Sequence, residues 1–181
     1  DWFPMPTAIP FLMKKGVGPY KKMKAKAAAQ LKNIRAIWGW NANLQITNKL
    51  IQSVIKIAKQ AGAVIMAIYK TDFNIQIKND KSPVTEADTK ANDIITAGLF
   101  EIAPDIPVLS EEGLDIPFEE RSIWESFWLV DPLDGTKEYI KKNDEFTVNI
   151  AYMQNNLPVF GVVYAPALNE MYWGSIEKGA F

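Results

Sequence analysis

The spacing of apolar residues differs between the first and second parts of residues 46–181, and that difference limits the folds the chain can adopt. In residues 46–68 and 87–102 apolar side chains recur at intervals of three and four, the period of an amphipathic helix. From residue 107 onward they alternate with polar residues or form short runs, as strands do. Helices that precede a series of strands favour an α+β fold with segregated layers over a doubly wound parallel sheet.

Two helices are predicted in the first of these regions. One covers residues 46–68 and can be capped by Thr47 or Asn48. The other begins at residues 85–88 (Thr-Glu-Ala-Asp), a capping-box pattern with Asp in the place that Glu usually holds. Between the helices, residues 73–78 alternate apolar and polar side chains, which predicts a half-buried strand.

Strands are predicted throughout the second region. Residues 107–110 and 127–130 are two short apolar strands, and the second suits the middle of a sheet. Three further strands, at 146–152, 159–164 and 170–173, are separated by short turns. This arrangement predicts an antiparallel meander.

The composition excludes several kinds of chemistry. The 181 residues include neither Cys nor His, which excludes disulfides, thiolate nucleophiles, histidine acid–base catalysis and metal sites with Cys or His ligands. Any catalysis must use carboxylates, hydroxyls, Lys, Tyr, backbone amides or a hard metal held by oxygen. No uninterrupted apolar run approaches the roughly 20 residues that cross a bilayer.

Charge is distributed unevenly along the chain. Residues 1–45 carry eight Lys or Arg and one acid, whereas residues 46–181 carry the other twelve basic residues and twenty acids. The shift predicts a basic leader, 1–45, that is poorly ordered or unrelated to the acidic domain, 46–181. The lysines and aromatic residues of the leader leave contact with an anionic membrane or with nucleic acid open as alternatives.

Three acids lie where predicted strands end. Glu111 follows the strand at 107–110, and Asp131 and Asp134 follow the strand at 127–130. A rigid scaffold presents groups to ligands from such positions. Carboxylates without His or Cys suit a hard cation, and Mg²⁺ binds a few carboxylates while sharing the phosphate oxygens of a substrate. The sequence therefore predicts a magnesium site.

The segment 131–136 (Asp-Pro-Leu-Asp-Gly-Thr) adds geometry for binding an anion. Pro132 favours an extended conformation before it, and Gly135 lets the backbone approach a ligand closely. Residues 136–140 can start a helix whose free N–H groups face an anion. Asp-Pro and Asp-Gly are also ordinary turn formers, and residues 85–88 are also an ordinary helix cap. Each motif alone therefore leaves a purely structural interpretation open.

Three segments, in this order, resemble the inositol monophosphatase superfamily. They are Ser-Pro-Val-Thr-Glu-Ala-Asp at 82–88, Val-Leu-Ser-Glu-Glu at 108–112 and Trp-Leu-Val-Asp-Pro-Leu-Asp-Gly-Thr-Lys-Glu-Tyr at 128–139. Gly-Thr-Lys-Glu followed by an aromatic residue, with Asn-Asp-Glu-Phe-Thr-Val-Asn-Ile from residue 143, resembles the 3'(2'),5'-bisphosphate nucleotidases of that superfamily. The resemblance implies an α/β/α sandwich of the sugar-phosphatase type, with two helices on a mainly antiparallel sheet.

The resemblance also implies an activity and a set of site residues. The activity is a magnesium-dependent, lithium-sensitive removal of the 3'-phosphate from 3'-phosphoadenosine 5'-phosphate, with two or three Mg²⁺ ions. The implied metal ligands are Glu111, Asp131, Leu133 (through its carbonyl) and Asp134. The implied catalytic residues, which orient and deprotonate the attacking water, are Asp88 and Thr136, together with Glu111. The implied phosphate-binding residues are Asp134, Gly135 and Thr136.

The family continues into a second α/β domain with a metal-binding Trp-Asp motif, whereas Trp173 is followed here by Gly174. We therefore expect residues 46–181 to correspond to the N-terminal domain, and the 181-residue chain alone to bind cations with little or no turnover. An inositol monophosphatase-type activity and a non-catalytic fragment that binds only metal or a partner are the alternatives. The expected partner is a small nucleotide bisphosphate in the cytoplasm, not nucleic acid. Self-association through the uncovered surface, and peripheral contact with the inner membrane, are secondary expectations.

Overall fold

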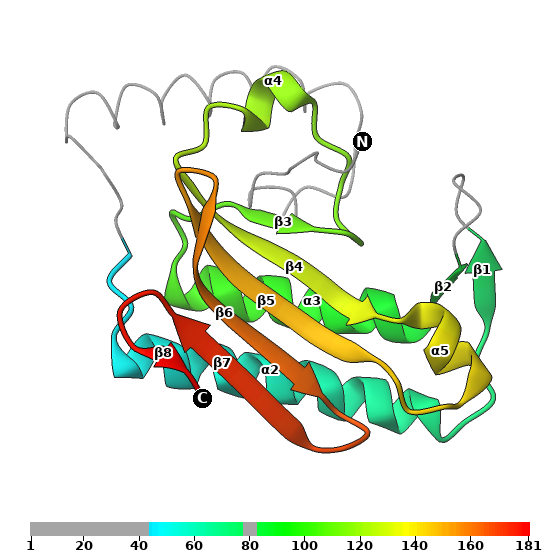
Figure 1. The fold of residues 1–181 in the computed structure, drawn as a ribbon. Helices are drawn as coiled ribbons and strands as arrows, with labels where there is room; N and C mark the ends of the chain where they lie inside the picture. Colours follow the sequence, from blue (N-terminus) through cyan, green and yellow to red (C-terminus); the bar gives the residue numbers. More distant parts are fainter. Residues whose placement is uncertain (1–43, 78–82) are drawn as a thin grey trace.

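The computed structural model of the chain describes residues 44–77 and 83–181. Two long helices, α2 (Asn48–Tyr69) and α3 (Glu86–Ile102), lie side by side on one face of a six-stranded sheet (Figure 1). This arrangement confirms the predicted α+β fold, with two helices on a mainly antiparallel sheet. The leader predicted at 1–45 lies almost wholly outside the described residues.

The sheet has the order β3-β4-β5-β6-β7-β8. Strand β3 (Val108–Ser110) runs parallel to β4 (Ser126–Asp134), and the other neighbouring pairs of this sheet are antiparallel. The remaining strands follow one another as hairpins and confirm the meander; they are β5 (Thr147–Gln154), β6 (Leu157–Ala165), β7 (Glu170–Ser175) and β8 (Gly179–Ala180). Two short helices, α4 (Phe118–Arg121) and α5 (Thr136–Lys141), flank β4 in the chain.

Both long helices begin at the caps that the sequence predicts. The Thr47 side chain accepts a hydrogen bond from the Leu50 N–H at 3.2 Å. At the start of α3, Asp88 Oδ2 accepts hydrogen bonds from the Thr85 N–H at 2.8 Å and from the Thr85 hydroxyl at 2.6 Å. The Thr85 oxygen in turn accepts one from the Ala87 N–H at 3.2 Å, which completes the capping box.

The core lies between the two helices and the side of the sheet that faces them. Alternate residues of the central strands point into it and are buried; they are Trp128, Val130, Val148, Ile150, Tyr152, Phe160, Val162 and Tyr164. The helices approach each other closely at Gly98, where an added Cβ would lie 2.7 Å from Ile57. The opposite side of these strands is therefore the face on which other side chains can meet a ligand.

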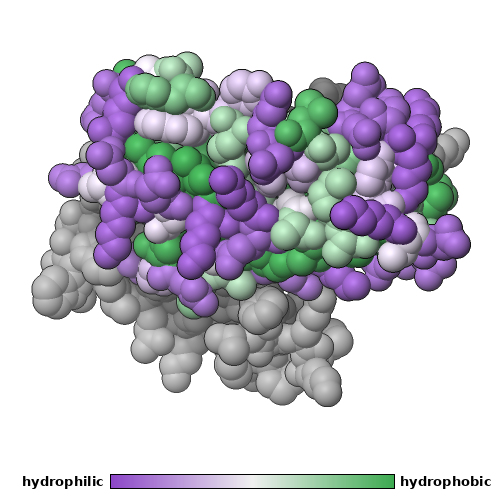
Figure 2. Space-filling model, turned by 90° about the horizontal axis from the view of Figure 1, so that it is seen from below, coloured by the Kyte–Doolittle hydropathy of each residue, from purple (hydrophilic) through white to green (hydrophobic). Residues whose placement is uncertain are grey.

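Helix α2 is long enough and apolar enough to cross a membrane by length and composition alone. Its apolar side packs against α3 and the sheet, however, and Lys49, Lys56 and Lys59 lie on its exposed side. Figure 2 views the molecule from below, where α2 lies in Figure 1, and shows hydrophilic side chains crossing the hydrophobic surface. We therefore assign α2 to the core of the domain.

Strand β1 (Ile75–Ile77) differs from its prediction. The sequence predicts a half-buried strand, but Ile75 is 49% and Ile77 66% exposed. Among the described residues, β1 pairs with β2 (Pro83–Thr85) in a separate two-stranded ribbon at one end of the main sheet (Figure 1). The prediction of burial was wrong for Ile75 and Ile77, because alternation alone does not show whether another layer covers a strand; Phe73, just before β1, is partly buried against the core.

Candidate metal and phosphate site

A β-bulge at the end of β4 brings Asp131 and Asp134 to the same face of the sheet. The sequence ends this strand at residue 130, whereas the structure continues it to Asp134. Residues three apart on a regular strand point to opposite faces. Here Asp131 pairs with Asn149 and Asp134 pairs with Thr147, so β4 accommodates one extra residue between them. Both carboxylates therefore lie on the face of the sheet away from the helices.

Glu111 reaches this face from the neighbouring strand. Ser110 lies beside Val130 in the parallel pair, and the Glu111 N–H donates to the Val130 carbonyl oxygen at 3.1 Å. Because Val130 points into the core, the next residue on each strand points the other way. Glu111 and Asp131 are thus neighbours on the outer face, and a side-chain hydrogen bond joins them.

Burial and two neighbouring carboxylates disfavour the charged form of Asp131. Burial raises the pKa of the Asp131 carboxyl to about 8, and the negative charges of Glu111 and Asp134 contribute to the rise. The Leu133 N–H, which donates to Asp131 Oδ1 at 3.2 Å, acts in the opposite direction. A bound cation would relieve this repulsion and favour the charged form of Asp131.

The donor set fits magnesium, although the side chains as placed do not yet surround an ion. Carboxylate and carbonyl oxygens are the ligands that Mg²⁺ takes. Within residues 44–77 and 83–181, no three acidic side chains converge closely enough to hold a metal. Asp134 Oδ2 accepts a hydrogen bond from Asn149 Nδ2 at 3.0 Å, which engages one of its two carboxylate oxygens. Metal binding would therefore require the acidic side chains to come closer together, from backbone positions that share one face.

Asp88 and Thr136 are in contact although they come from different elements. Thr136 Oγ1 lies 3.0 Å from Asp88 Oδ1 and 3.2 Å from the Leu133 carbonyl oxygen. Asp88 is 1% exposed, and its other oxygen, Oδ2, holds Thr85 at the cap of α3. Capping of α3 therefore uses Oδ2 and leaves Oδ1 available to accept a hydrogen bond from Thr136.

Gly135 makes the turn from β4 into α5. Its φ of +94° lies in the left-handed region, and an added Cβ would lie 2.7 Å from the Glu145 carbonyl oxygen. The backbone itself thus requires glycine here, a reason that the sequence analysis did not give. The turn places Thr136 at the first position of α5, where N–H groups have no partner within the helix.

Comparison with known proteins identifies the family. Residues 47–181 match the profile of the Inositol monophosphatase family. The chain belongs to this family. It is 52% identical over 126 residues to the 3'(2'),5'-bisphosphate nucleotidase CysQ of Shigella flexneri, a match that covers 68% of this chain and 50% of that protein. It is 50% identical over 132 residues to the same-named protein of Salmonella typhimurium, with coverages of 71% and 53%.

Solved structures agree with this assignment. CysQ from Bacteroides thetaiotaomicron, described as a bacterial member of the inositol monophosphatase family, is similar with a TM-score of 0.63 and 43% identity, covering 77% of this chain and 49% of that one. The chain thus spans about half the length of the relatives that it matches. Members of the family are magnesium-dependent, in keeping with the oxygen donors described above.

In this member of the inositol monophosphatase family, two side chains, Tyr139 and Lys142, anchor α5 to α2, a role that the sequence did not predict for either. Tyr139 is fully buried, and its hydroxyl donates to the Ile65 carbonyl oxygen at 3.1 Å. Lys142 follows α5, and its Nζ lies 4.5 Å from the ring centroids of both Tyr69 and Phe73. The same ammonium donates to the Tyr69 carbonyl oxygen at the C-terminal end of α2, where a cation is favoured.

Two polar residues of β5 were also missed. Thr147 Oγ1 donates to Asn149 Oδ1 at 3.1 Å, and Asn149 Nδ2 donates to Asp134 Oδ2. The alternation in this strand was interpreted only as a sign of its buried side. The polar side of the same alternation, on the strand that pairs with β4, was the signal that could have found them.

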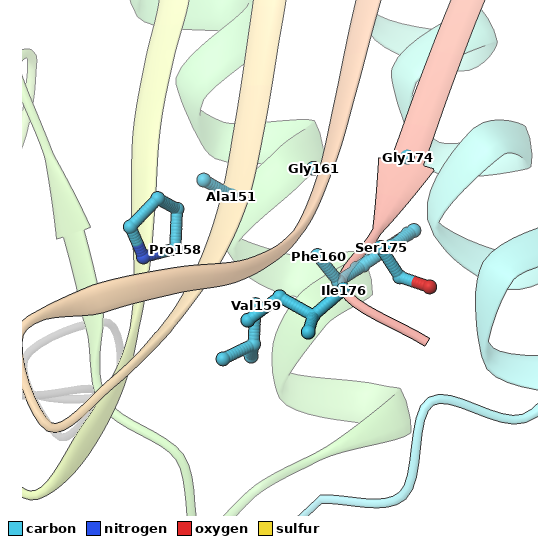
Figure 3. Close-up of a pocket in the computed structure, with 8 residues that line it drawn as sticks. All are labelled: Ala151, Pro158, Val159, Phe160, Gly161, Gly174, Ser175 and Ile176. Atoms are coloured by element: carbon cyan, nitrogen blue, oxygen red, sulfur yellow. The ribbon is translucent and has the colours of Figure 1, made fainter. Parts of the chain in front are cut away.

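A hollow of about 210 Å³ on the sheet lies outside this set of acids (Figure 3). Its lining is small or apolar apart from one hydroxyl; the residues are Ala151, Pro158, Val159, Phe160, Gly161, Gly174, Ser175 and Ile176. Ala151, Gly161 and Gly174 are cross-strand neighbours whose small side chains leave the space open. The hollow offers no carboxylate to a metal.

Proposed function

We propose that this chain supplies the metal- and phosphate-binding half of a magnesium-dependent phosphatase. The reaction is removal of the 3'-phosphate from 3'-phosphoadenosine 5'-phosphate, giving AMP and phosphate. The observation that carries the proposal is the gathering of Glu111, Asp131 and Asp134 on one face. The names of the relatives support a nucleotide bisphosphate as the substrate. Residues 46–181 would correspond to the N-terminal domain of such an enzyme.

The carboxylates of Glu111, Asp131 and Asp134, with the Leu133 carbonyl, would hold Mg²⁺, and we propose two or three ions in the complete site. When bound, the metal neutralises phosphate charge and lowers the pKa of water. The protein positions these oxygens from two adjacent strand ends, which is a rigid arrangement. Positioning and charge neutralisation are the main requirements of phosphoryl transfer, so a site without His is adequate.

Thr136 and Asp88 would take the proton of the attacking water. The Thr136 hydroxyl has one proton and two acceptors within reach, and the Asp88 carboxylate is the stronger of the two. Donation to Asp88 leaves the lone pairs of Thr136 Oγ1 free to accept a hydrogen bond from water. It also leaves the Leu133 carbonyl oxygen free for the metal. As Oγ1 takes the proton of that water, its own proton would pass to Asp88 Oδ1. Glu111 is proposed to act beside them on the same water.

The phosphate would be held beside Asp134 by the backbone N–H groups of Gly135 and Thr136. These groups stand at the start of α5, where N–H groups lack partners within the helix. The left-handed turn at Gly135 leads the backbone from β4 into α5, and the absence of a side chain avoids a clash with the Glu145 carbonyl oxygen.

Activity on an inositol monophosphate is the second candidate, favoured by the family match. The run Lys137-Glu138-Tyr139 supports the nucleotide instead, since it matches the nucleotidases. Of these residues, Tyr139 is buried and serves packing, whereas Lys137 is exposed one residue after Thr136 and can meet an anion. A substrate of this kind suggests the cytoplasm as the location of the protein.

Phosphate release tests the proposal. Because the chain spans half of its relatives, residues 47–181 would replace the matching half of the Shigella flexneri nucleotidase, and the unmodified 181-residue chain would be assayed in parallel. With Mg²⁺, we expect the chimera to release phosphate from 3'-phosphoadenosine 5'-phosphate faster than from inositol monophosphate. We expect the chain alone to show little turnover. A folded chimera that is inactive on both substrates would overturn the phosphatase, and preference for the inositol ester would overturn only the choice of substrate.

A further inference from the structure

We propose that Thr147 and Asn149 form a hydrogen-bond relay that positions the Asp134 carboxylate for the cation. This inference rests on the proposed function, because it assigns Asp134 to the metal. The relay runs along the outer face of β5, from the Thr147 hydroxyl to the Asn149 amide and from there to Asp134. Thr147 and Asn149 are positioning residues that act through Asp134.

The chemistry of the three groups fixes the direction of the relay. An ionised carboxylate only accepts hydrogen bonds, so Asn149 must present its NH₂ group to Asp134 Oδ2, at 3.0 Å. The amide oxygen of Asn149 then faces Thr147, and the hydroxyl donates to it at 3.1 Å. The reverse orientation of the amide would place two acceptor oxygens against each other. Each member therefore holds the next in one orientation.

The bulge in β4 explains why Asp134 needs such support. Asp134 lies beyond the irregular step and pairs with Thr147, whereas Asp131 pairs with Asn149 before it. Asn149 thus lies directly across from Asp131 and donates a hydrogen bond to Asp134. These two contacts span the extra residue of β4. Asp134 is exposed, so packing does not restrict its side chain. The Asn149 amide supplies the restriction that packing does not.

The relay also divides the two oxygens of Asp134 between two tasks. The hydrogen bond from Asn149 engages Oδ2, and Oδ1 is left to turn toward the cation. Partners of this kind, which orient a ligand without touching the metal, typically change metal affinity or activity by about 10–100-fold when they are removed. Asn149 is therefore expected to affect the metal through Asp134.

Magnesium-dependent thermal stabilisation of the full 181-residue chain tests the relay without any activity assay. A ligand that binds only the folded state stabilises it by RT ln(1 + c/Kd), where c is the free ligand concentration, so the increase in melting temperature with Mg²⁺ concentration reports the dissociation constant. The variants are Asn149→Ala and Thr147→Val, which removes the hydroxyl and keeps the shape. Thr147→Ser, which keeps the hydroxyl, and Asn92→Ala, which removes an amide that contacts Thr96 on α3, are matched controls.

We expect Asn149→Ala to weaken Mg²⁺ binding about 10–100-fold and Thr147→Val to weaken it in the same direction. Thr147→Ser and Asn92→Ala should bind Mg²⁺ as the unmodified chain does. A purely structural role would lower the melting temperature without metal and leave the Mg²⁺-dependent increment unchanged, and that result would overturn the relay alone. If Asn149→Ala does not fold, the comparison of Mg²⁺ binding by Thr147→Val and by Thr147→Ser decides whether the relay acts on the metal. Failure of the unmodified chain to respond to Mg²⁺ would overturn the metal site and the relay together.

Discussion

At Asp131, burial and the charges of neighbouring acids act together. The residue lies between two other acids, and its pKa rises to about 8 from an ordinary value of 3.8. In the metal-free protein, a raised pKa means that the folded state favours the protonated form. The stability that this group contributes is therefore fully present below about pH 3.8 and is lost as the pH rises toward 8.

Magnesium should displace the proton of Asp131. Because a ligand carboxyl must be ionised to bind, we expect Mg²⁺ affinity to rise with pH up to about 8. Calorimetric titrations at pH 7 in two buffers of different ionisation enthalpy would measure the proton released on binding. We expect Mg²⁺ binding to release a proton from the unmodified chain and none from Asp131→Asn. Equal heats in both buffers for the unmodified chain would contradict this assignment.

Thr136 and Asp88 should affect the rate more than the binding of substrate. In the chimera, Thr136→Ala or Asp88→Asn is expected to lower kcat by about 10²–10⁴-fold, the usual scale of general-base help, with a smaller change in KM. Thr136→Ser keeps the hydroxyl and is the control. Steady-state kinetics would check both quantities, and a variant with full kcat would restrict residues 85–88 to their capping role.

At the scale of elements, local patterns predicted most of the structure. The caps of α2 and α3 follow from the residue types at their N-termini, and the two apolar strands and the meander follow from apolar runs and alternation in the sequence. The bulge between Asp131 and Asp134 did not, because register depends on pairing with β5 and not on β4 alone. The relay from Thr147 depends on the same pairing, which is why it was also missed.

Lys142 should stabilise the attachment of α5 to α2. Lys142→Met removes the ammonium from the two rings and from the end of α2, and we expect a loss of about 1 kcal/mol in the free energy of unfolding, the scale of an exposed cation–π contact. Lys141→Met, which removes only an exposed ion pair with Glu138, is the matched control and should change less. Urea unfolding would measure both, and equal effects would contradict a specific role for Lys142.

At the scale of the whole molecule, the candidate site gathers residues from five elements around one end of β4. Asp88 comes from α3, Glu111 follows β3, and Thr136 begins α5, while β4 and β5 supply the remainder. The sequence could predict the acids because their types and order are characteristic. It could not predict how far their side chains stand from a common centre, since that depends on the packing of all five elements and on the ion itself.

Magnesium titration of the 181-residue chain is the most direct test of the proposed metal site. Isothermal calorimetry would compare the unmodified chain with Asp131→Asn and with Asp105→Asn, which changes an exposed acid between α3 and β3. We expect saturable binding by the unmodified chain and by Asp105→Asn, and at least about tenfold weaker binding by Asp131→Asn. The same affinity in all three proteins, or no binding in any, would contradict a metal site at Glu111, Asp131 and Asp134.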